Sequence, residues 1–153
     1  MFQTRNKLPA LVARLLPLVV TLAIASGCAY ESPRPVFPID QPIADSLIAG
    51  RWTCTSPNEP EMRVTISESR PREYAIEISA SGRNTARLRG FIGRDGQTTI
   101  LNLQQIGASD MISRDRYAAV RYAHRDGGSL DVDVLKSREN GADVYTPLLH
   151  CVR

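Results

Sequence analysis

From residue 48 onward, apolar and polar residues alternate in short runs that are separated by turn-forming residues. A period of two is typical of strands that bury one face, and no run in this region has the period of an amphipathic helix. We therefore expect strands at residues 48–55, 61–67, 73–79, 87–93, 98–104, 116–124, 129–136 and 144–152. Eight short antiparallel strands with hairpin-length links favour an all-β fold, a small eight-stranded up-and-down barrel, with an open β-sandwich as the alternative.

The hairpin around Asp95-Gly96 predicts an unusual pair of outward-facing apolar residues. Asp-Gly is the pair preferred in a two-residue type I′ turn, and a turn at these positions places Phe91 opposite Ile100. Both side chains then point away from the interior, as an apolar cross-strand pair. We expect this pair either to be covered by the N-terminal segment or to contact a partner.

The following hairpin requires a three-residue loop at 126–128, with a glycine in the left-handed region. This loop sets Tyr122 against Val132 on the inner face and pairs Arg121 with Asp133 on the outer face. A two-residue loop would mix the two faces, because a slip of one residue reverses every side chain.

Residues 1–27 have the features of a secretory signal peptide. Basic residues precede an apolar run from Leu15 to Ala25, and small residues follow it. The run is too short to span a bilayer comfortably, and an uncleaved membrane anchor is the alternative.

The segment Ile24–Cys28, IASGC, resembles the lipobox of bacterial lipoproteins, although Ala25 stands where leucine is usual. The resemblance implies that Cys28 is lipidated and becomes the first mature residue. Several acyl chains on one residue would hold the protein at a membrane, at about 0.8 kcal/mol for each buried methylene. Ala29 follows in place of aspartate, which in this family resembles proteins sorted to the outer membrane, with the domain in the periplasm.

Residues 28–42 form the next segment, which contains four prolines. Such a segment cannot be a helix or a central strand, and it is typical of an extended tether. Residues 43–153 are then one small barrel domain.

Charge gives no support for nucleic-acid binding. The chain has 19 basic and 16 acidic residues, but three basic residues belong to the signal peptide, so the mature charge is close to neutral. The stretch Arg114–Arg125 is basic and contains aromatic residues, a pattern that can bind nucleic acid or anionic lipid. We expect the acidic residues of the next strand to neutralise it.

Cys54 and Cys151 remain once Cys28 is assigned to the lipid. In an oxidising compartment such a pair forms a disulfide, here between the first and last strands. The chain-entropy estimate for this loop is about 4–5 kcal/mol. The alternative is a free catalytic thiol, but no histidine stands in an obvious partner motif.

Gly50 and Trp52, preceded by the short segment Ile39–Ile48, resemble the start of a lipocalin-like, calycin-type barrel. The resemblance implies a short turn of helix before the first strand. It also implies that Trp52 closes one end of the barrel and packs against a basic residue on the last strand, for which Arg153 is the counterpart. Small periplasmic protease inhibitors share a similar opening and size, but their usual early cysteine pair is missing here.

No arrangement of residues in the sequence predicts catalysis, a cofactor or a metal site. His124 and His150 each lie in a strand without a second ligand at metal spacing. Asp131 and Asp133 share a face with Arg121, which favours solvated ion pairs. No serine stands in a nucleophile elbow, and no glycine-rich phosphate loop is present.

The sequence thus predicts a non-catalytic lipoprotein at the periplasmic face of the outer membrane, attached through Cys28. Its barrel is a binding or structural module that contacts an envelope protein or a small apolar ligand. The alternative is an inhibitor of a secreted protease or lysozyme. Trp52, Phe91 and Ile100 are the candidate contact residues.

Overall fold

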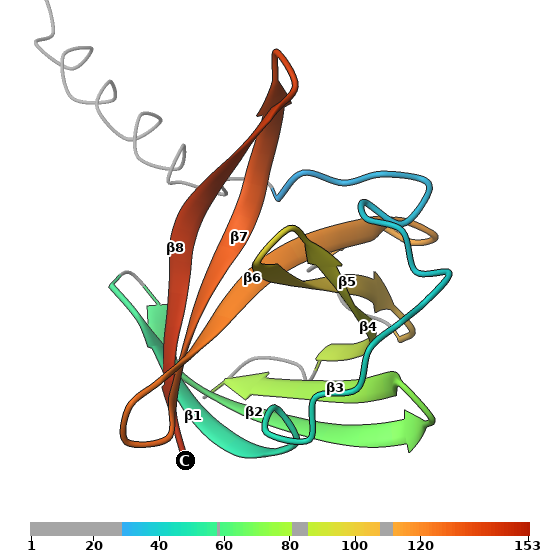
Figure 1. Ribbon diagram of the computed structural model, residues 1–153. Helices are drawn as coiled ribbons and strands as arrows, with labels where there is room; N and C mark the ends of the chain where they lie inside the picture. Colours follow the sequence, from blue (N-terminus) through green and yellow to red (C-terminus); the bar gives the residue numbers. More distant parts are fainter. Residues whose placement is uncertain (1–28, 58, 81–85, 108–111) are drawn as a thin grey trace, which may run out of the picture.

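The computed structural model describes residues 29–57, 59–80, 86–107 and 112–153. Eight antiparallel strands, each paired with the next in sequence, close into a barrel (Figure 1). The strands are β1 (Gly50–Ser56), β2 (Glu59–Arg70), β3 (Glu73–Ala80), β4 (Ala86–Asp95), β5 (Thr98–Gln105), β6 (Tyr117–Arg125), β7 (Ser129–Glu139) and β8 (Ala142–Val152). The predicted up-and-down barrel is confirmed, and the sandwich is excluded because β1 pairs with β8.

Alternation places one apolar face of every strand inside the barrel. The main core includes Trp52, Tyr74, Leu88, Ile92 and Tyr122, all buried. The described residues contain no helix that is both long enough and apolar enough to cross a membrane.

The predicted register of the β4–β5 hairpin is wrong by two residues. Asp95 pairs with Thr98, so the two-residue turn is Gly96-Gln97, and Phe91 lies opposite Asn102 rather than Ile100. A shift of two residues leaves every side chain on its predicted face, so alternation alone cannot distinguish the two registers. The β6–β7 hairpin has the predicted register, with Tyr122 opposite Val132.

A disulfide joins Cys54 to Cys151, as predicted, across the seam that closes the barrel. In the described part of the chain, this seam has only three paired positions, from Thr53–Val152 to Thr55–His150, fewer than any other strand pair. The covalent link therefore reinforces the shortest junction of the barrel.

The N-terminal segment, residues 29–49, runs along the barrel (Figure 1); its middle part lies on the outer face, whereas Ala29, Ile43 and Ile48 contact the main core. Val36 and Phe37 are buried against Ile100, together with residues of β6 and β7. The backbone N–H of Phe37 donates to Asn102 Oδ1 at 3.0 Å. The segment is extended, as its prolines predict, but it packs on the barrel instead of standing apart from it, because its apolar pair covers an apolar outer patch.

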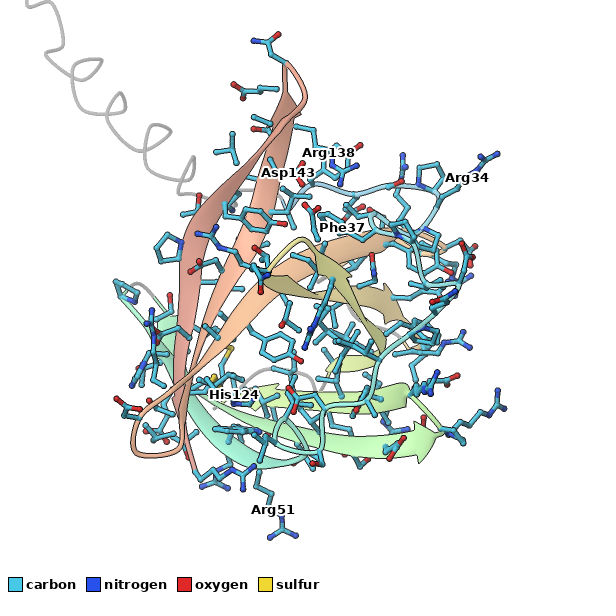
Figure 2. All side chains as sticks on the ribbon, in the orientation of Figure 1. Arg34, Phe37, Arg51, His124, Arg138 and Asp143 are labelled. Atoms are coloured by element: carbon cyan, nitrogen blue, oxygen red, sulfur yellow. A yellow bond between two sulfur atoms is a disulfide. The ribbon has the colours of Figure 1, made fainter. Side chains whose placement is uncertain are left out.

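Arg138, at the β7–β8 hairpin, contacts the N-terminal segment and holds it in place. Its guanidinium lies 4.9 Å from the ring centre of Phe37, donates to the Val36 carbonyl at 3.1 Å, and pairs with Asp143 at 2.8 Å. Figure 2 shows Arg138, Asp143 and Phe37 gathered beside the hairpin, far from His124 at the other end of the barrel.

Candidate functional site

The interior of the barrel contains a partly open, mainly apolar cavity of about 630 Å³ that is lined by residues from all eight strands. Its wall is mainly aliphatic, with Met62, Val64, Leu88, Leu103 and Val132 among the lining residues. Cavities of about 300–1,000 Å³ with mostly apolar walls are typical of small-ligand sites. An eight-stranded barrel is just wide enough to hold one such ligand.

Trp52 and Arg153 close one end of this cavity, which we call the Trp52 end. The indole N–H donates to the Ile48 carbonyl at 2.9 Å. The guanidinium of Arg153 lies 4.8 Å from the centre of the indole ring and donates to the carbonyl oxygens of Leu47 and Ala49. The contact implied by the lipocalin resemblance is therefore present, with the arginine immediately after β8. A turn at residues 46–48 replaces the expected turn of helix.

At the Trp52 end, Asp45 connects the N-terminal segment to the barrel wall through a cluster of hydrogen bonds that the sequence did not predict. Its Oδ2 accepts hydrogen bonds from the hydroxyl of Tyr122 and from His124 Nε2, each at 2.9 Å. Its backbone N–H donates to the hydroxyl of Tyr74 at 2.8 Å, and its Oδ1 accepts from the backbone N–H of Leu47. The cluster thus joins the N-terminal segment to β3 and β6.

Two pKa values reflect this arrangement. Burial, the largest single influence, raises the pKa of Asp45, but the hydrogen bonds from His124, Tyr122 and Leu47 together lower it below its usual range. Burial and the hydrogen bond to Asp45 raise the pKa of Tyr122 far above its usual range. The pair therefore consists of a carboxylate and a protonated phenol, which suits a structural hydrogen bond.

Replacement of Asp45 by asparagine should weaken the folded state at neutral pH by about 1.5–3 kcal/mol, the usual range for hydrogen bonds to a charged group. Because the folded-state pKa of Asp45 is lowered, its contribution is present above the unfolded-state pKa and is lost as pH falls through the folded-state pKa. Urea unfolding at neutral and acidic pH should therefore show a smaller acid-dependent loss in Asp45→Asn than in the wild type. The exposed Asp40 provides the control variant Asp40→Asn, and equal pH dependence in all three proteins would contradict this role.

The opposite end of the cavity, which we call the Ala29 end, lies where β5 ends and β6 begins. Ala29, Glu31, Ile112, Ser113 and Lys136 line it. Glu31 Oε1 accepts a hydrogen bond from the Ser113 backbone at 3.0 Å. This end therefore adds polar side chains to a cavity that is otherwise largely apolar.

A second hollow, about 1,070 Å³, lies on the outer surface of β6, β7 and β8 and extends to the end of β1 and the start of β5. Its charged side chains pair with one another. Arg121 binds Asp133, and Asp131 binds both Arg125 and His150, each at 2.7 Å. These pairs confirm the predicted ion-pair ladder, and the hydrogen bonds from His150 and Arg125 lower the pKa of Asp131. We therefore regard the interior cavity as the stronger candidate site.

The structure separates the three predicted contact residues. Trp52 lines the cavity, whereas Ile100 is fully buried under the N-terminal segment on the outer face. Phe91 is half-buried and lies opposite Asn102, not opposite Ile100. Cys28 lies outside the described residues. Across the described ranges, no group of three or more acidic, cysteine or histidine residues could hold a metal ion.

Comparison with protein-family models, with curated proteins and with solved structures found no match to this chain. The closed eight-stranded barrel is consistent with a small calycin-like barrel.

Proposed function

We propose that this protein is a non-catalytic, lipid-anchored lipoprotein of the bacterial outer membrane whose barrel binds a small apolar ligand. The observation that carries the binding function is the apolar cavity of about 630 Å³. The lipobox-like IASGC at Ile24–Cys28 supports the anchor. The Gly50-x-Trp52 opening and the contact of Arg153 with Trp52 support a lipocalin-like barrel.

The cavity suits an elongated ligand with one polar end. Its aliphatic wall would contact a hydrocarbon chain, and each buried methylene contributes about 0.8 kcal/mol. The polar side chains at the Ala29 end would lie beside a head group. We therefore propose a fatty acid or the acyl chain of a lipid as the ligand class.

Ala118→Phe should abolish this binding by filling the cavity. Ala118 is buried, lies on β6 and lines the cavity wall. Titration of the unlipidated Cys28→Ser protein with a fluorescent fatty acid should show at least a tenfold loss of affinity when Ala118→Phe is added. Ala123→Phe adds the same bulk to an exposed position of the same strand and should leave the binding of the Cys28→Ser protein unchanged. Equal binding with either added substitution, or no binding by the Cys28→Ser protein itself, would refute the proposed function.

Cys28→Ser should release the protein from membranes, because the thiol is the attachment point implied by the lipobox resemblance. Fractionation of cells that express the full chain should move the protein from the membrane pellet to the soluble periplasmic fraction. Ser26→Ala is the control, since a small residue is kept at that position. Continued sedimentation of Cys28→Ser with the membrane would contradict lipid anchoring at this residue.

A further inference from the structure

The Ala29 end of the cavity lies one residue from the proposed lipid attachment point. Ala29 lines the cavity and packs against the main apolar core. Adjacent Cα atoms are about 3.8 Å apart, so Cys28 is bonded directly to a residue of the cavity wall. We propose that one acyl chain of the lipid on Cys28 folds back and occupies the barrel. The inference rests on the proposed function, since it requires both the anchor and a cavity that accepts a hydrocarbon chain.

The described segment after Cys28 leaves little slack between the lipid and the cavity. The Tyr30 backbone N–H donates to the Leu135 carbonyl at 2.8 Å. Ser32 and Tyr117 exchange two backbone hydrogen bonds, at 2.9 and 2.8 Å. Ala29 is therefore held at the cavity by the residues that follow it, and no free tether separates the residue after Cys28 from the Ala29 end.

The cavity has room for one long acyl chain. A water molecule in the liquid takes about 30 Å³. If a methylene group needs similar space, the cavity of about 630 Å³ holds on the order of twenty such groups. This is enough for one chain and too little for two, so the other chains of the lipid would remain in the membrane. Two membrane-inserted chains are sufficient for stable anchoring.

The polarity of the two ends sets the direction of the chain. The ester-linked portion beside Cys28 would lie near Glu31, Ser113 and Lys136 at the Ala29 end. The methyl end would point toward Trp52, where the cavity is closed by the indole and Ile48. An attached chain of this kind is also favoured over free lipids, because a short link gives an effective concentration of about millimolar.

Photocrosslinking in cells tests the proposal on the full chain. Cells would incorporate a fatty acid that carries a diazirine near its methyl end into the lipid on Cys28, and ultraviolet light would then attach this end to its nearest neighbour. Peptide mass spectrometry should place the adducts on residues that line the Trp52 end of the cavity, such as Ile48, Trp52 and Tyr122. Ala118→Phe should reduce these adducts at least tenfold, whereas Ala123→Phe should leave them unchanged.

Each other outcome overturns the proposal in a distinguishable way. Adducts confined to membrane lipids or to the outer surface of the barrel would overturn it. In that case, binding of a free fatty acid by the Cys28→Ser protein would show that the proposed ligand-binding function still holds. Interior adducts of equal yield in Cys28→Ser would overturn it in favour of a free lipid as the occupant. Absence of label on Cys28 would overturn both the inference and the lipid anchor.

Discussion

Replacement of both Cys54 and Cys151 by alanine is expected to lower the free energy of unfolding by about 4–5 kcal/mol. The chain-entropy model gives this value for a loop of about one hundred residues, and the two cysteines are 97 positions apart. The seam they join has only three paired positions, so few hydrogen bonds remain to compensate. Urea unfolding of the Cys28→Ser protein with and without the two cysteine substitutions, followed by circular dichroism, measures the loss of unfolding free energy.

Reductant provides the matched control for this prediction. It should destabilise the wild type by a similar amount and leave the double variant unchanged. Hydrogen exchange should accelerate first at the β1–β8 seam, because the other seven strand junctions retain their full registers. A double variant within about 1 kcal/mol of the wild type would contradict the proposed role of the disulfide in stability.

Trp52→Ala should cost about 3–5 kcal/mol, the range for truncation of a large buried aromatic residue. The indole is only 3% exposed, and it contacts both Ile48 and Arg153. Its loss would enlarge the cavity and leave the Ile48 carbonyl without its donor. Urea unfolding followed by circular dichroism gives the size of the effect.

Two further variants separate the causes of this loss. Trp52→Phe should cost less than Trp52→Ala, since the phenyl ring keeps most of the apolar contact. Val144→Ala, on a strand residue that is 42% exposed, should change stability by less than about 0.5 kcal/mol. A cost below about 1 kcal/mol for Trp52→Ala would show that the indole does not support the closed end.

The eight strands, their faces and the disulfide were predictable because each depends on local alternation or on a pair of cysteines. The β4–β5 register was not, since a two-residue slip preserves both faces. Cover of Ile100 by the N-terminal segment was one of the two outcomes predicted for this outward-facing apolar residue, and the structure shows it. The prolines of the segment exclude helix but do not specify that Val36 and Phe37 provide the cover, which emerges only in three dimensions.

The candidate site was predictable only in part. Trp52 was singled out because of its position after Gly50, and the resemblance indicated its arginine partner. Asp45 was missed because its partners Tyr74, Tyr122 and His124 lie 29 to 79 positions away in the chain. The interior volume also depends on how side chains from all eight strands meet, which no local pattern specifies.

The most direct test of a lipid-binding barrel uses Trp52, the single tryptophan of the chain, as a contact reporter. The Cys28→Ser protein would be titrated with a fatty acid that carries bromine, a contact quencher, near its methyl end. We predict saturable quenching of Trp52 fluorescence at one equivalent, weaker quenching when bromine is near the carboxyl group, and none in Ala118→Phe. The absence of saturable quenching, or equal quenching in Ala118→Phe, would contradict a ligand site inside the barrel.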